Sequence, residues 1–302
     1  MIEVKGLTKK FGEEAALENI SCTISDNCIY GLVGSNGAGK STLLRILAGV
    51  YKPDSGSALM DGEPIWENPK AKARLAYVSD ELYYISGATM ERMAQMYRGL
   101  YPAFAMDKFK KLSKELGLDP QKSLNTFSKG MRRQAITILA LSANPDYIYF
   151  DETFDGLDPV VRNYFKKLII DDMAERGASA IITSHSLREL EDTCDQLALL
   201  HRGGLVLESD IGKMKTSRFK VQVGFNREFA REDFAGMDIA LFKKNGSVAN
   251  MIISGDRDKT VAQLSAMNPA ILDILPLSLE EVFTYEMQLL GYELGLEEGG
   301  AE

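Results

Sequence analysis

The sequence predicts an α/β fold followed by a smaller α+β domain. Short, largely apolar runs at 29–33, 74–78, 147–150 and 180–185 have the length of buried strands, and segments of helical periodicity separate them. A glycine-rich loop leads from the first of these runs into an apolar-periodic segment at 43–48. Strand, glycine loop and helix in this order indicate a phosphate-binding loop.

The composition is that of an ordinary soluble globular protein, with 302 residues, 45% of them hydrophobic and 26% charged. The net charge is −8 and no segment concentrates Lys and Arg, so we expect no nucleic-acid partner. No apolar run approaches the roughly 18 residues of a membrane span, and the N-terminus lacks a signal peptide's apolar region. We expect a cytoplasmic protein whose three cysteines, which lack metal-ligand spacing, stay reduced.

The glycine loop carries the residues that phosphate binding requires. It reads Gly34, Ser35, Asn36, Gly37, Ala38, Gly39, Lys40, Ser41 and Thr42. The glycines let the backbone curl so that its N–H groups point at phosphate oxygens, and the following helix adds its positive N-terminal dipole. We expect Lys40 to bridge the β- and γ-phosphates and Ser41 to ligate Mg²⁺. The alternative, a glycine-rich turn with a fortuitous lysine, does not account for both flanks.

Other segments surround this loop. Two antiparallel strands are expected before it, one through Ile2 and Val4 and one over 17–24. Phe11 lies between them, and by itself it favours packing in the core; stacking on a base, as an exposed aromatic, is the alternative. From 89 to about 124, apolar residues recur at helical spacings and predict an inserted helical subdomain. Its methionines and aromatics are expected in the core, with a partner-facing groove as the alternative.

Two carboxylates directly follow the apolar run at 147–150. In a protein with a phosphate loop, a carboxylate at such a strand end meets the Mg²⁺ held by the loop, which assigns Asp151 to the metal. Glu152 would then lie where a water attacks the γ-phosphate and can act as general base. His185 also ends a strand, at the edge where open α/β sheets bind ligands, and this favours a functional over a structural role.

Taken together, residues 1 to about 210 resemble the nucleotide-binding subunit of ABC transporters. The resemblance rests on motifs in the family's order: Phe11 as the adenine-stacking aromatic, the phosphate loop at 34–42, the signature Ser128-Lys129-Gly130-Met131, Asp151 and Glu152 as the magnesium and catalytic carboxylates, Gly156-Leu157-Asp158 as the dimer loop, and His185 as the switch histidine. It implies an α/β P-loop NTPase core with an antiparallel β-subdomain over residues 1–212, and a helical subdomain at about 81–142.

The resemblance also implies partners and a reaction. Two such subunits pack head to tail, so that ATP on one phosphate loop is covered by Ser128 and Gly130 of the other subunit, and Asp158 is counted among the nucleotide-binding residues. Hydrolysis of ATP with Mg²⁺ therefore implies a dimer. Integral membrane permease subunits would hold this dimer at the inner face of the cell membrane.

Several positions depart from the family pattern. The signature reads Phe-Ser-Lys-Gly-Met instead of Leu-Ser-Gly-Gly-Gln, and Asp80 stands where a glutamine normally senses magnesium and contacts the membrane partner. With the ending at 277–283, these features resemble the bacterial ABC-2 exporter ATPases, especially the acetoin-utilisation or Ytr-like subgroup. We expect Asp80 to act as a hard oxygen ligand at the magnesium edge. The alternative is that Asp80 faces solvent or a basic residue of the membrane partner.

Beyond about residue 210 the ATPase motifs stop. The segments over 216–302 follow the order β-α-β-β-α-β of a ferredoxin-like split motif, with a terminal helix at 279–290. We expect this accessory α+β domain to regulate the protein or to stabilise the dimer, and the alternative is that it only packs against the rest of the protein. The expected function of the chain is ATP-driven transport. A regulatory subunit with little hydrolysis and a soluble ABC ATPase outside transport are the alternatives.

Overall fold

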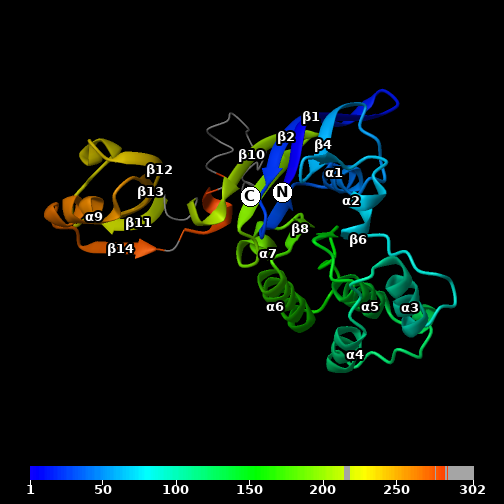
Figure 1. Cartoon of the computed structure of the whole chain (residues 1–302). Helices are drawn as coiled ribbons and strands as arrows, with labels where there is room; N and C mark the ends of the chain where they lie inside the picture. Colours follow the sequence, from blue (N-terminus) through cyan, green and yellow to red (C-terminus); the bar gives the residue numbers. More distant parts are fainter. Residues whose placement is uncertain (214–217, 276, 283, 285–302) are drawn as a thin grey trace, which may run out of the picture. The chain divides into compact units, whose positions relative to one another are not determined.

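The computed structural model describes residues 1–213, 218–275, 277–282 and 284. The chain divides into two compact units, Met1–Ser209 and Asp210–Glu302, each with its own hydrophobic core. Figure 1 shows the elements of each unit along the chain. The assignment of 1–212 as an ATPase domain and 216–302 as an accessory domain stays a prediction.

The first unit is built on a six-stranded sheet in the order β10-β9-β3-β8-β7-β6. Its strands are β3 (Ile29–Val33), β6 (Leu75–Val78), β7 (Tyr147–Phe150), β8 (Ser179–Ser184), β9 (Gln196–His201) and β10 (Gly204–Asp210). Neighbouring strands from β9 to β6 run parallel. Every residue of β3, β7 and β8 is buried, as expected for strands whose two faces are both covered.

The register of these parallel strands aligns their carboxyl ends. Val33 at the end of β3 pairs with Ser184 at the end of β8. Phe150 at the end of β7 lies opposite Val78 of β6 and Ile182 of β8. Four segments therefore start next to one another at one edge of the sheet, at residues 34, 79, 151 and 185.

Helix α1 (Lys40–Leu47) packs between this sheet and a second, antiparallel sheet. Its apolar residues share one core cluster with strand residues of both sheets. The antiparallel sheet has the order β2-β1-β4-β5. Its strands are β1 (Ile2–Phe11), β2 (Glu14–Ile24), β4 (Ser55–Met60) and β5 (Glu63–Pro64). The two strands expected before the phosphate loop are confirmed, and Ile2 pairs with Ile24 at their outer ends.

Helix α6 (Pro159–Arg176) shows how local sequence sets the ends of an element. The Asp158 carboxylate caps it by accepting hydrogen bonds from the N–H groups of Val160 and Val161. Gly177, with φ +63°, ends it in the left-handed conformation that glycine adopts without strain.

Helices α3 (Met90–Leu100), α4 (Met106–Glu115) and α5 (Lys129–Ser142) contact one another within the range expected to form a helical subdomain, and that subdomain stays a prediction (Figure 1). Met90, Met93 and Phe109 are buried among them, which confirms the core role expected for the methionines and aromatics. Shorter segments of the first unit are α2 (Pro69–Ala73), the 3₁₀ turn η1 (Leu124–Thr126) and α7 (Leu187–Glu191).

The second unit is a four-stranded sheet in the order β12-β13-β11-β14. Its elements are β11 (Arg218–Gly224), η2 (Arg231–Phe234), β12 (Asp238–Asn245), β13 (Val248–Ser254), α9 (Arg257–Ala266) and β14 (Ile271–Leu275). The expected order of elements is present, but the first expected helix is only the 3₁₀ turn η2. Most of the terminal helix expected at 279–290 lies outside the described residues. In the part of the chain that is described, no helix is long and apolar enough to cross a membrane.

Deleting residues 216–302 is expected to leave the first unit folded and able to bind a nucleotide. This unit has its own core and contains every residue expected to contact phosphate. Thermal unfolding of the truncated chain and a titration with ATP would measure both properties. A truncated chain that unfolds cooperatively but no longer binds ATP would contradict the independence of the two units.

Candidate nucleotide-binding site

The phosphate loop connects β3 to α1 and is pressed tightly against its surroundings. A Cβ atom at Gly34 would lie 2.4 Å from the carbonyl oxygen of Leu200, and one at Gly39 would lie 2.5 Å from that of Ala16. Gly39 also has φ +103°, a conformation that is open in practice only to glycine. The loop sequence is therefore dictated both by neighbouring backbone and by its own backbone conformation.

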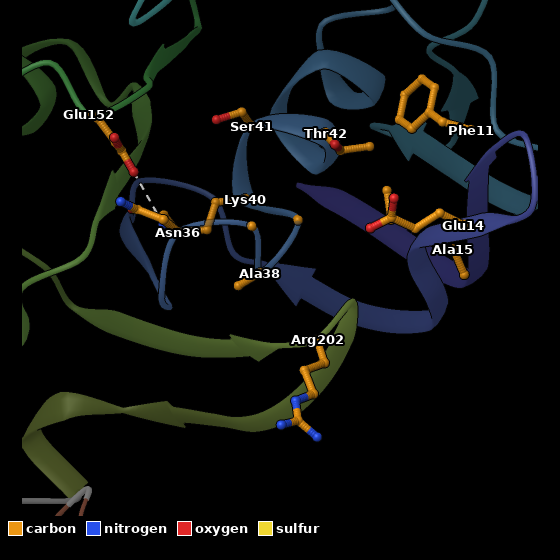
Figure 2. A pocket seen from close by; sticks show the side chains of 13 residues that line it. Phe11, Glu14, Ala15, Asn36, Ala38, Lys40, Ser41, Thr42, Glu152 and Arg202 are labelled. Carbon is orange, nitrogen blue, oxygen red and sulfur yellow. Dashed lines mark ion pairs between the residues drawn. The ribbon is translucent and has the colours of Figure 1, made fainter. Parts of the chain in front are cut away.

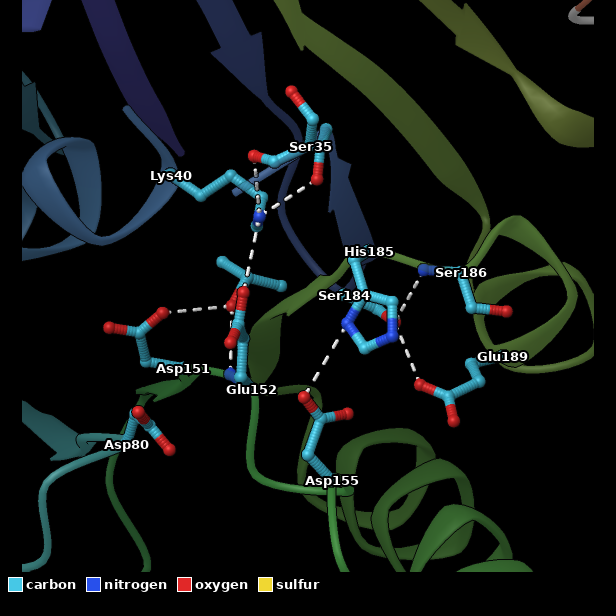
Figure 3. Close-up of polar contacts among 12 residues, drawn as sticks. Ser35, Lys40, Asp80, Asp151, Glu152, Asp155, Ser184, His185, Ser186 and Glu189 are labelled. Atoms are coloured by element: carbon cyan, nitrogen blue, oxygen red, sulfur yellow. Dashed lines mark hydrogen bonds and ion pairs between the residues drawn. The ribbon is translucent and has the colours of Figure 1, made fainter. Parts of the chain in front are cut away.

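Lys40, the first residue of α1, folds back into the loop. Its side chain is only 4% exposed. The Nζ atom donates hydrogen bonds to the carbonyl oxygens of Gly34 at 2.8 Å and Ser35 at 3.2 Å. It also lies 3.1 Å from Oε1 of Glu152 (Figures 2 and 3). The structure thus brings together the lysine and the glutamate expected to act on the γ-phosphate.

Asp151 is fully buried and accepts hydrogen bonds from three hydroxyl groups. Ser41 Oγ and Thr183 Oγ1 each lie 2.9 Å from its Oδ1, and the Tyr77 hydroxyl lies 2.9 Å from its Oδ2. Strand β7 lies between β8 and β6, so Asp151 at its end is flanked by Thr183 of β8 and Tyr77 of β6. Burial and the charge of Asp151 raise the pKa of Tyr77 above its ordinary value, so this phenol stays a donor at neutral pH.

Ser41 and Asp151 supply the hard oxygen atoms that Mg²⁺ prefers. Among the described residues, no group of three or more His, Cys, Asp or Glu side chains is arranged to hold a metal ion. A pair of protein oxygens nevertheless suits Mg²⁺, which takes its remaining ligands from water and phosphate. The residues present therefore fit the cation that the sequence predicted.

Glu152 has a strained backbone. Its φ of +47° is left-handed, which costs a residue other than glycine about 1 kcal/mol or more. Its N–H group donates to Thr183 Oγ1 at 2.9 Å, and its carbonyl oxygen accepts a hydrogen bond from Nη1 of Arg133 at 3.0 Å. Both sides of the residue are thus held while its carboxylate faces Lys40.

His185 follows β8 at the expected edge, with its side chain 54% exposed. Its Nδ1 lies 3.5 Å from Oδ2 of Asp155, three residues beyond Glu152 (Figure 3). Burial and the nearby carboxylates of Glu189 and Glu152 raise the pKa of Asp155, against the opposing effect of His185. The geometry places His185 beside the turn that begins at Glu152, and its expected role in the reaction stays a prediction.

A cleft of about 590 Å³ opens over the phosphate loop (Figure 2). It is lined by Phe11, Glu14, Ala15, Ala16, Asn36, Gly37, Ala38, Gly39, Lys40, Ser41, Thr42, Glu152 and Arg202. Phe11 is 48% exposed and meets the ring of Tyr51 edge-on at 5.4 Å, so it is not a core residue. Glu14 and Arg202 also line the cleft, but neither belongs to a sequence motif that predicted this position. Arg202 lies in the turn between β9 and β10, which the fold brings to the cleft.

Three expected nucleotide-binding residues lie elsewhere in the chain. Ser128 caps α5, where its Oγ accepts a hydrogen bond from the N–H of Met131 at 3.2 Å, and Gly130 lies in the first turn of that helix. Asp158 caps α6. The cleft over the phosphate loop is lined by other residues of the same chain. Within one chain, the structure does not bring these three residues to the phosphate loop.

Asp80 pairs with a cation of its own chain. Its carboxylate is half exposed, and Oδ1 lies 2.5 Å from Nη2 of Arg133. The other carboxylates expected at the metal edge, Asp151 and Glu152, have the partners described above. The expected metal role of Asp80 stays a prediction. The alternative was that Asp80 faces solvent or a basic residue of the membrane partner. Asp80 does face a basic residue, but this residue, Arg133, belongs to the same chain.

A comparison with known proteins identifies the family. The chain is 30% identical over 283 residues to the ABC transporter ATP-binding protein YtrB of Bacillus subtilis, a match that covers 94% of this chain and 97% of YtrB. The chain belongs to the ATP-binding proteins of ABC transporters. A family model described as ABC transporter matches residues 17–155. Membership of this family makes the chain an ATP-binding subunit and an ATPase.

Further ABC proteins agree with this identification. The daunorubicin/doxorubicin resistance ATP-binding protein DrrA of Streptomyces peucetius is 30% identical over 222 residues, which cover 72% of this chain and 67% of DrrA. Among solved structures, an ATP-binding subunit of an ABC transporter matches with a TM-score of 0.65 at 23% identity, over 71% of this chain and 92% of that one. The cassette MJ0796 bound to ADP and Pi matches with a TM-score of 0.63 at 22% identity, over 70% and 99%. These structural matches confirm the predicted P-loop NTPase fold.

The substitutions Gly39→Ala and Gly37→Ala are expected to differ in their cost. Both glycines have positive φ, but a Cβ at Gly37 would meet no atom within 4 Å, whereas one at Gly39 would collide with a carbonyl oxygen. Gly37→Ala should therefore lower the free energy of unfolding by about 1 kcal/mol and Gly39→Ala by about 3 kcal/mol. Urea unfolding of the two variants measures the difference, and equal losses would show that the loop is not tightly packed.

Proposed function

We propose that the chain is the ATP-hydrolysing subunit of an ABC-2-type transporter, in which ATP closes a head-to-tail dimer and hydrolysis reopens it. The convergence of Lys40, Asp151 and Glu152 at one sheet edge carries the proposal. The similarity to YtrB supports the subgroup, because it extends over 94% of the chain and so includes the second unit. The similarity to DrrA, a resistance protein by name, supports the exporter type.

In the proposed reaction, Lys40 exchanges the Glu152 carboxylate for a phosphate oxygen. Two of the three donors of its ammonium group already serve the carbonyl oxygens of Gly34 and Ser35. A γ-phosphate bound at Lys40 therefore competes with Glu152 for the third donor. The displaced carboxylate is then free to accept the proton of the water that attacks phosphorus.

The other groups bind and orient. We assign Mg²⁺ to Ser41 and Asp151, where it would neutralise phosphate charge when bound. Tyr77 and Thr183 hold the Asp151 carboxylate through their hydroxyl groups. Phe11 offers its exposed ring at the cleft for stacking on the adenine base.

Ser128, Gly130 and Asp158 are assigned to the nucleotide of a second subunit. They lie at the starts of α5 and α6, away from the cleft of their own chain. The N-terminus of a helix attracts phosphate through its dipole and its free N–H groups. The dimeric structure of the related cassette MJ0796 supports this arrangement.

Permease subunits are the proposed membrane partners, and they would hold the dimer at the inner face of the cell membrane. The related protein cbiO1 is described as part of the ABC transporter complex cbiONQ, which supports such an assembly. The direct experiment compares the ATPase rate of the isolated chain with its rate in the complex co-purified from membranes. A rate that the membrane partner changes supports transport; a chain that purifies alone and hydrolyses ATP without response to membranes would contradict it.

Lys40→Ala is expected to weaken ATP binding by about 100-fold or more, because it removes the buried cation proposed to bind the phosphates. Lys52→Ala serves as the matched control, since Lys52 is exposed just beyond α1. Isothermal titration with ATP and Mg²⁺ measures both affinities. If Lys40→Ala binds ATP as tightly as Lys52→Ala does, the assigned role of Lys40 is wrong.

Glu152→Gln is expected to lower ATP turnover by about 100-fold or more, since an amide cannot accept the proton of the attacking water. Its affinity for ATP should be unchanged or higher, because a neutral side chain competes less for Lys40. The variant should also form a stable dimer with ATP, which light scattering after size-exclusion chromatography would detect. Turnover at the wild-type rate would exclude Glu152 as the base.

A further inference from the structure

Arg133 is a buried cation that has no role in the reaction proposed above. It lies near the start of α5 and is only 2% exposed. A buried guanidinium is costly unless charged and polar partners surround it. Its partners therefore indicate what the position does.

The guanidinium joins the segment after β6 to the segment after β7. Nη1 donates to the carbonyl oxygen of Glu152 at 3.0 Å and to that of Asp155. Nη2 lies 2.5 Å from Oδ1 of Asp80 and also donates to the Asp80 carbonyl oxygen at 3.3 Å. Glu152 and Asp155 are the two ends of a turn that is closed by the Asp155 N–H donating to the Glu152 carbonyl at 3.2 Å.

Glu152 depends on such support because its backbone is left-handed, with φ +47°. Thr183 fixes the N–H side of this residue and Arg133 fixes the carbonyl side. Without the guanidinium, the carbonyl oxygens of Glu152 and Asp155 would lose their charge-assisted hydrogen bonds, and only the Asp155 N–H would still hold the peptide after Glu152, so the turn could open. The carboxylate would then leave its place opposite Lys40.

We propose that Arg133 is a positioning residue for Glu152, and that Asp80 holds Arg133 in place through their ion pair. This inference rests on the proposed role of Glu152 in hydrolysis. Asp80 thereby connects the segment after β6 to the proposed general base through one side chain. A shift of Asp80 reaches Glu152 because the same guanidinium binds both residues.

The test is a double-mutant cycle of steady-state ATP hydrolysis with the full chain. Arg133→Gln should lower kcat about tenfold while KM for ATP changes less than about twofold, because the base is misplaced but the phosphate loop is intact. Asp80→Asn should lower kcat about fourfold, and Asp80→Glu, which keeps the charge, should stay within about twofold of wild type. In the Arg133→Gln background, Asp80→Asn should have less than about a twofold further effect, since the ion pair is already lost.

Asp146→Asn is the matched control, because it removes an aspartate from a surface ion pair with Arg74 at 2.5 Å. Its kcat should equal that of wild type. Losses at Asp80 and Arg133 that simply multiply in the double variant would overturn the inference, as would a wild-type kcat in Arg133→Gln. If Arg133→Gln does not fold, the two Asp80 variants still decide: equal kcat values in Asp80→Asn and Asp80→Glu would overturn it.

Failure of the inference can be told apart from failure of the proposed function. A wild-type chain without ATPase activity, or one whose activity survives Glu152→Gln, would contradict the function. An active wild-type chain that loses activity in Glu152→Gln but keeps it in Arg133→Gln would contradict only the inference.

Discussion

The common register of four parallel strands is the constraint on which the site depends. Because β3, β8, β7 and β6 end at the same edge, the segments that follow them start side by side. Lys40 and Asp151 are more than 100 residues apart in the sequence, and Asp151 and His185 are more than 30 residues apart. The sheet gathers them without any local signal that they belong together, as is general for ligand sites of open α/β sheets.

Charge is balanced around Glu152 by two cations that are almost fully buried. Lys40 lies opposite its carboxylate, and Arg133 binds its carbonyl oxygen. The left-handed backbone of Glu152 is strain that the surroundings must offset, and strain of this kind concentrates at functional sites. The proposed catalytic role of Glu152 and the stability of this turn thus depend on the same contacts, so substitutions of Arg133 are expected to change turnover before they change nucleotide affinity.

The sequence predicted the parts of the site that follow from local chemistry. Glycine spacing identified the phosphate loop, and apolar runs that end in polar residues identified Asp151, Glu152 and His185. It did not predict that Tyr77 and Thr183 hold Asp151. Each is a single polar residue near the end of an apolar strand, and such a residue forms no motif that indicates its partner. The partner of Asp80 was also missed: Arg133 lies 53 positions away, on helix α5, and no local pattern indicates such a tertiary pairing.

In the proposed reaction, Lys40 exchanges the Glu152 carboxylate for the γ-phosphate. The most direct measurement is a crystal structure of the wild-type chain with Mg²⁺ and a non-hydrolysable ATP analogue. We expect a γ-phosphate oxygen within hydrogen-bond distance of Lys40 Nζ and a Glu152 carboxylate that has left the 3.1 Å ion pair and faces a water. An analogue bound in the cleft while Lys40 and Glu152 remain paired would contradict it.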